Sequence, residues 1–127
     1  AAGSEGAIRL LGQLPPEEVR QVLWAADAFV LNTHLDPNPL SAIEAAAAGL
    51  PVVMSAASGN VREIVEKPSA GFVISNPADS TEALRSVLAA SDEELSGMGQ
   101  RAAAVAHDQF NSTSVAQRLI WQLYPRA

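Results

Sequence analysis

The sequence predicts an α/β fold in which a Rossmann-like, doubly wound parallel sheet of about four strands is flanked by helices. Two observations carry this prediction. Short, predominantly apolar runs alternate with helical patterns along most of the chain. Strands buried on both faces have this continuous apolar character, whereas half-buried antiparallel strands alternate polar and apolar residues. After about residue 79 only helical patterns follow, which predicts an all-helical C-terminal end. The 127 residues form one predicted domain, 1–127.

The four predicted strands occupy 7–12, 28–32, 51–55 and 71–75. They are the runs AIRLLG, AFVLN, PVVMS and GFVIS, in which apolar residues predominate. Between and after them lie the predicted helices.

The first helix, over 15–27, begins with two prolines and has acids in its first turn, both typical of helix N-termini. The second covers 39–49 and ends at Gly49, and a short third helix is predicted over 61–66. Two later helices have the spacing of capping boxes at their starts, and a final apolar stripe marks a C-terminal helix. These residues are Asp79 with Glu82, Ser91 with Glu94, and the stripe Val115, Leu119, Ile120 and Leu123.

Composition excludes several classes of function. The formal charge of −6, with no Lys/Arg cluster, disfavours binding to nucleic acid or an anionic membrane surface. With no cysteine there is no disulfide framework, thiolate metal site or cysteine nucleophile. No signal peptide is recognisable, and the longest apolar stretch, 45–57, is too short to cross a bilayer. We therefore expect a soluble, cytoplasmic-type domain.

The segment DPNPL leads into the second helix and is the first candidate site. In open parallel sheets, ligands bind where strand ends lead into helix N-termini. Asn38 is predicted to cap the helix and Pro39 to occupy its first position, so that the amides of Leu40 and Ser41 point outward as an anion site. The two prolines are expected to hold Asp36 just ahead of this helix.

Glu44 is the one charged residue between Leu40 and Met54. A lone helical glutamate is usually a solvent-facing helix former. Here the nearly all-apolar helix suggests burial, and a buried carboxylate needs hydrogen-bond donors. Sugar or ribose hydroxyls would supply them.

These residues carry a family resemblance. Asp36, seven residues, Glu44 and then AAAAGLPVV resemble the acidic motif of retaining glycosyltransferases with the two-domain GT-B fold, glycosyl transferases group 1. That motif is usually Glu, seven residues, Glu and AMACGLPVV. IRLLGQLPPEEVRQVLWAADAFVLNT, GNVREIV, AGFVISNPADSTEALRSVL and QFNSTSVAQRLIWQLY resemble further family segments, so that nearly the whole chain is covered, in order.

The resemblance implies that residues 1–127 are the later part of the C-terminal donor-binding domain. It implies that Glu44 contacts the nucleotide ribose and Asp36 the donor sugar. The amides of Asn38, Leu40 and Ser41 would hold the diphosphate and hexose, and Gly59 and Asn60 form a possible donor loop, for which a plain turn is the other reading. Asp36 is one methylene shorter than the usual Glu, and Pro39 removes one amide donor.

Further expectations follow from the family. The donor is a nucleotide-diphosphate sugar, and no cofactor or metal is required. The acceptor, a glycan, lipid or small molecule, would bind a separate N-terminal domain, and no catalytic residue is assigned within this chain. The chain alone is expected to be inactive, to dimerise through an exposed sheet edge, and to belong to a cytoplasmic enzyme that can lie at the inner face of the membrane.

Two alternatives remain at this stage. A GT-B nucleotide-sugar epimerase shares the architecture but not the spaced acid pair. A non-catalytic α/β binding or assembly domain would use the two acids only as surface residues. The other polar and aromatic candidates are assigned ordinary roles: His34 in a variable loop, His107 late in a helix, and Trp24 and Trp121 in packing.

Overall fold

The computed structural model describes residues 6–113 and 115–116. Within them the fold is α/β, with the parallel sheet order β1-β2-β3. The strands are β1 (Phe29–Leu31), β2 (Val52–Ser55) and β3 (Gly71–Ile74). The helices are α1 (Pro16–Ala25), α2 (Leu40–Ala47), η1 (Arg62–Glu66), α3 (Thr81–Ala89) and α4 (Asp92–Phe110). Three of the four predicted strands are confirmed.

Strand β2 lies at the centre and is buried along its whole length. Val52 and Met54 face the main core, with η1, α2 and α4, whereas Val53 faces a smaller cluster under α3. Since helices cover both faces of the sheet, the doubly wound arrangement is confirmed. Successive strand residues point to opposite faces, which is why Val52, Val53 and Met54 are all apolar.

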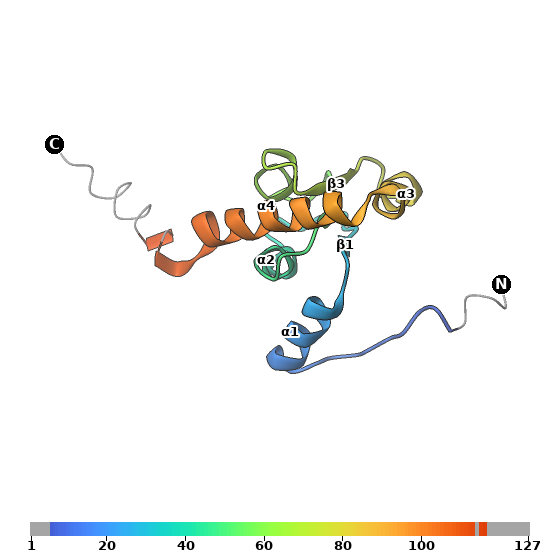
Figure 1. Ribbon diagram of the computed structural model, residues 1–127. Coiled ribbons are helices and arrows are strands. Elements are labelled where there is room, and N and C mark those ends of the chain that lie inside the picture. Colours follow the sequence, from blue (N-terminus) through green and yellow to red (C-terminus); the bar gives the residue numbers. More distant parts are fainter. Residues whose placement is uncertain (1–5, 114, 117–127) are drawn as a thin grey trace.

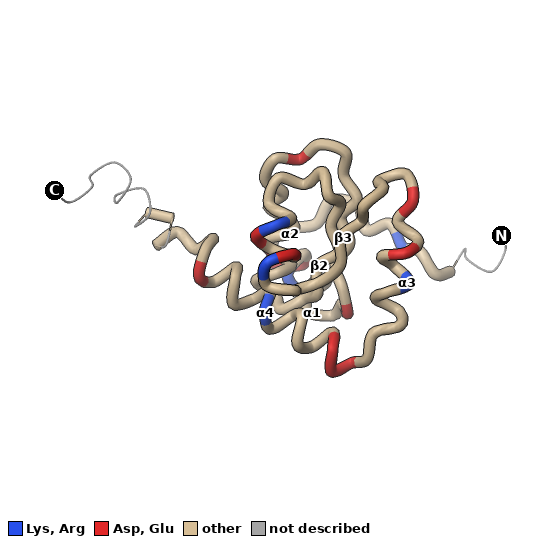
Figure 2. The backbone as a smooth tube through the Cα atoms, turned by 90° about the horizontal axis from the view of Figure 1, so that it is seen from above, with Lys and Arg blue, Asp and Glu red and all other residues tan. Residues whose placement is uncertain are grey.

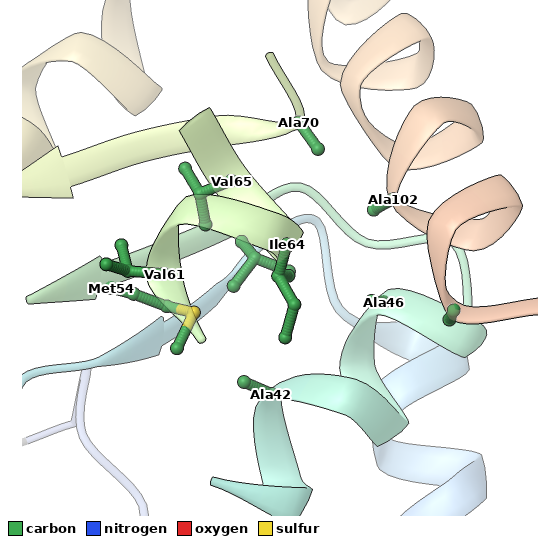
Figure 3. Packing of buried hydrophobic residues seen from close by; sticks show 10 residues of the cluster. Ala42, Ala46, Met54, Val61, Ile64, Val65, Ala70 and Ala102 are labelled. Atoms are coloured by element: carbon green, nitrogen blue, oxygen red, sulfur yellow. The ribbon is translucent and has the colours of Figure 1, made fainter. Parts of the chain in front are cut away.

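The main core is built from small side chains. Ala42 and Ala46 on α2, and Ala102 on α4, are completely buried with Ile64 of η1 (Figure 3). Small residues let the helices approach closely. A β-carbon on Gly99 would lie 2.0 Å from the carbonyl oxygen of Gly49, which ends α2 with a φ of +83°.

The N-terminal part of the chain lies apart from this core. Helix α1 lies below the sheet in Figure 1 and leads into β1. The described segment before α1 extends away from both α1 and the sheet. The predicted strand over 7–12 is wrong, because residues 6–7 form a turn, no described strand runs beside the rest, and Leu10 is 96% exposed. A strand forms only when a neighbour accepts its hydrogen bonds. The predicted helix 15–27 is confirmed as α1, yet none of its residues is buried.

Of the two predicted capping boxes, one is confirmed and the other is wrong. Ser91 and Glu94 form the predicted capping box, with hydrogen bonds in both directions. The box predicted for Asp79 and Glu82 is wrong, because α3 begins one residue later than that spacing requires. Asp79 instead accepts the backbone N–H of Thr81 at 3.0 Å. The C-terminal stripe falls largely outside the described residues.

Charge is spread over the molecule. Acidic residues recur around the described backbone (Figure 2), in keeping with the formal charge of −6. Of the helices that the structure describes, none combines the length and apolar character needed to cross a membrane.

Candidate functional site

The loops after β1 and β2 lie against each other at the carboxyl end of the sheet. The buried Ser55 hydroxyl donates to the carbonyl of Thr33 at 2.6 Å and lies 3.3 Å from the hydroxyl of Ser58. Asp36 and Ser58 form an isolated parallel bridge. The structure therefore joins the loop of Asp36 to the loop of Gly59, as open parallel sheets arrange their ligand loops.

Gly59 is required where these loops touch. Its N–H donates to the carbonyl of Asp36 at 2.9 Å. A β-carbon at this position would lie 2.0 Å from the carbonyl oxygen of Pro37, so every other residue would push the loops apart. Gly59 therefore does more than make a turn, since it allows a close approach between the two loops.

The predicted N-cap role of Asn38 is wrong. Helix α2 begins at Leu40 with Pro39 in the capping position, and no side chain caps it. Asn38 is engaged elsewhere. Its backbone N–H donates to the Asp36 carboxylate at 3.1 Å, and its side-chain oxygen accepts from Asn60 at 3.1 Å. The first turn of α2 thus keeps backbone N–H groups that no capping side chain satisfies.

The predicted burial of Glu44 is also wrong. Glu44 is exposed, because α4 and η1 cover only one side of α2. Leu40 and Ser41 are exposed too. Residues three and four apart share a helix face, so Leu40, Ser41 and Glu44 lie along one accessible stripe. Since the helix rises about 1.5 Å per residue, this stripe runs about 6 Å from the helix start to Glu44.

A cleft of about 450 Å³ opens beside Glu44, between α1 and α2. Sequence reasoning missed it. The prediction for Trp24 was a packing role, but this side chain is 66% exposed and lines the cleft. The signal was present in the helical spacing of the α1 residues on this face. The cleft is lined by Leu14, Pro16, Val19, Arg20, Leu23, Trp24, Glu44, Ala47 and Ala48.

The remaining candidates stay outside this arrangement. His34 is exposed, and His107 lies 3.3 Å from Asp108 on the surface. In the described part of the chain, no three acidic, histidine or cysteine side chains gather as a metal site would require. At the start of α3, hydrogen bonds from the hydroxyl and then the backbone N–H of Thr81 lower the pKa of Asp79.

Comparison with known proteins shows the family to which this chain belongs. The model of the family "Glycosyl transferases group 1" matches residues 1–105. The chain belongs to this family, and its Rossmann-like sheet is that of a GT-B glycosyltransferase.

Individual relatives are similar over nearly the whole chain. D-inositol 3-phosphate glycosyltransferase from Corynebacterium kroppenstedtii is 32% identical over 94% of this chain and 24% of the relative. A putative colanic acid biosynthesis glycosyltransferase from Escherichia coli K12 is 30% identical over 91% of this chain and 30% of the relative. The chain thus spans less than a third of these relatives.

A solved structure is similar in fold. Sucrose-phosphate synthase from Thermosynechococcus elongatus superimposes with a TM-score of 0.80 over 96% of this chain and 30% of that protein. Sequence identity there is 24%, so this likeness bears on the fold alone.

Proposed function

We propose that this chain supplies the donor-binding part of a retaining glycosyltransferase. The reaction would move a hexose-type sugar from a nucleotide-diphosphate sugar to a hydroxyl acceptor. The bond between the anomeric carbon and the diphosphate breaks, the acceptor oxygen bonds to the same face of that carbon, and the hydroxyl proton is released. One observation carries the proposal: an exposed stripe of α2 joins the Asp36 loop, an uncapped helix start and Glu44 at the rim of a cleft.

Each part of the donor has a proposed place along this stripe. The diphosphate lies at the start of α2, where the free N–H groups of the first turn and the helix dipole favour negative charge. Glu44 accepts the ribose hydroxyls, and the nucleoside occupies the cleft beside Trp24. Asp36 and Asn38 lie at the other end, toward the sugar.

The same helix start supports catalysis without a metal. The diphosphate gains charge as it leaves, and N–H dipoles that are already oriented stabilise that charge without reorganising. Leu40 and Ser41 would carry this role through their backbone, which is the reason for proposing that no cofactor or metal is required. The acceptor, a glycan, lipid or small molecule, binds residues beyond this chain, so we propose that the chain alone is inactive.

Titration calorimetry tests the proposal, with UDP-glucose, GDP-mannose and ADP-glucose as probes of the full-length polypeptide that carries this chain. Glu44→Ala removes a charged hydrogen-bond acceptor and is expected to weaken binding about 10- to 100-fold. Glu66→Ala removes another exposed glutamate, on η1, and serves as the matched control. Equal behaviour of the two variants, or no binding of any probe by the wild type, would exclude the proposed function.

We also propose that the chain forms a homodimer through β1. Among the strands that the structure describes, β1 lies at the edge of the sheet, and its Val30 is 43% exposed. Exposed apolar sheet edges favour pairing with another chain. Light scattering should show twice the mass of the chain, and a monomer at micromolar concentration would refute this. The cytoplasmic location, with peripheral contact at the inner membrane face, remains a prediction from sequence.

A further inference from the structure

Two asparagine side chains connect the loops at the candidate site. Asn38 is exposed in the loop ahead of α2, whereas Asn60 is only 6% exposed at the base of the neighbouring loop. The Asn60 amide donates to the Asn38 side-chain oxygen at 3.1 Å. The residues are 22 positions apart, so this bond ties two segments that are otherwise linked through Gly59 and Ser58.

The buried member of the pair is not fully satisfied. The side-chain oxygen of Asn60 has no hydrogen-bond partner among the described residues, although it is shielded from solvent. A buried acceptor without a donor disfavours the folded state, and such groups are rare in native proteins. An amide kept only for stability would use both of its ends. Here the side-chain oxygen of Asn60 has no partner among the described residues, while its NH₂ group donates to Asn38. This arrangement suits a residue that positions Asn38.

The bond to Asn38 continues toward Asp36. The backbone N–H of Asn38 donates to the Asp36 carboxylate at 3.1 Å. A relay therefore runs from Asn60 through Asn38 to the carboxylate. Its base is rigid, because the carbonyl of Asn60 accepts the N–H of Ile64 at 3.0 Å and Ile64 is completely buried.

We propose that Asn60 is a positioning residue that acts through Asn38 and sets the Asp36 carboxylate for the donor sugar. The inference rests on the proposed function. It differs from the sequence-based expectation of a donor loop at Asn60, since a buried Asn60 acts behind the loop and does not contact the donor. The relay reaches only the Asp36 end of the site. Glu44 and the cleft lie at the other end of the α2 stripe, so the nucleotide portion should be bound independently of Asn60.

This separation gives the test. Binding is measured for whichever of UDP-glucose, GDP-mannose and ADP-glucose the wild type prefers, and for the matching free UDP, GDP or ADP. Asn60→Ala should weaken sugar-nucleotide binding about 10-fold and leave binding of the free diphosphate within about 2-fold. The thermal midpoint should change by less than about 4 °C, because the variant loses one hydrogen bond and also removes an unpaired acceptor. Gln100→Ala, an exposed amide on α4, is the control.

A double-mutant cycle with Asn38→Ala completes the experiment. If Asn60 acts through Asn38, the double variant binds the sugar nucleotide no more weakly than the weaker single variant. Additive losses, or equal losses for the sugar nucleotide and the free diphosphate, would overturn the relay while leaving the proposed function intact. A wild type that binds none of the probes would overturn both.

Discussion

The helices that cover the sheet and the segment that precedes it show how differently similar apolar patterns can behave. In the main core even alanines such as Ala42, Ala46 and Ala102 are completely buried, because α2, η1 and α4 pack on β2 and on one another. Over residues 6–27 much larger side chains, such as Leu10 and Trp24, remain exposed. Apolar character gives a segment the capacity for burial, whereas a packing partner determines whether burial occurs. Stability should therefore reside in the first region.

The largest expected effect contrasts one residue from each region. Ile64→Ala removes a completely buried side chain and leaves a cavity, which should lower the free energy of unfolding by about 2–5 kcal/mol. Leu10→Ala changes a side chain that is 96% exposed and should cost less than about 0.5 kcal/mol. Urea denaturation measures both values. Similar losses for the two variants would show that 6–27 packs as closely as the core.

A second pair tests how closely α4 approaches α2. Gly99→Ala places a β-carbon 2.0 Å from the backbone oxygen of Gly49, which cannot move away as a side chain can. We expect a loss of about 1–3 kcal/mol in unfolding free energy. Gly97→Ala lies in the same helix and meets only the flexible end of Arg101 at 3.2 Å.

The Gly97 variant should gain up to about 1 kcal/mol, because alanine is the better helix former. Thermal unfolding of both variants checks the difference in sign. A stabilising Gly99→Ala would contradict the close contact between α2 and α4.

The starts of two helices give a third, smaller contrast. Ser91 accepts the N–H of Glu94 at 3.1 Å in a complete capping box, whereas Ser80 at the start of α3 makes no side-chain cap. Ser91→Ala should cost about 1 kcal/mol and Ser80→Ala close to nothing. Chemical denaturation of the two variants side by side tests this, and equal costs would show that the capping box contributes nothing.

Sequence patterns predicted the fold well where local interactions decide it. Between Pro16 and Phe110 the strands and helices were predicted within a few residues, because periodicity, prolines and Gly49 act over one or two turns. The segment 7–12 failed for the opposite reason, since a strand depends on a neighbour that its own residues do not specify. Composition also suggested burial of Glu44, but it cannot tell which face of a helix is covered.

Only part of the geometry of the candidate site can be predicted from the sequence, because some of it depends on contacts between distant residues. The spacing of Asp36 and Glu44 lies within one short segment and can be recognised directly in the sequence. The Asn38–Asn60 bond joins residues 22 positions apart. The sequence predicted Asn38 as the cap of α2, but its backbone N–H donates to Asp36 and its side-chain oxygen accepts from Asn60. The hydrogen-bond partners of such side chains depend on competition between groups that are distant in the sequence. A single sequence does not reveal which of these groups lie close together.

The smallest expected effect concerns Asp79, at the start of α3, which lies on the face of the sheet opposite the main core. The hydroxyl and the backbone N–H of Thr81 favour the charged carboxylate, which lowers the pKa of Asp79 below its ordinary value of 3.8. Because the folded pKa lies below the unfolded one, the stabilisation is present above about pH 4 and is lost as pH falls through the folded pKa. The difference in thermal midpoint between the wild type and Asp79→Asn should therefore shrink from pH 7 toward pH 2.5. An NMR titration of the carboxyl group provides the direct check, and a midpoint at or above 3.8 would contradict the Thr81 contacts.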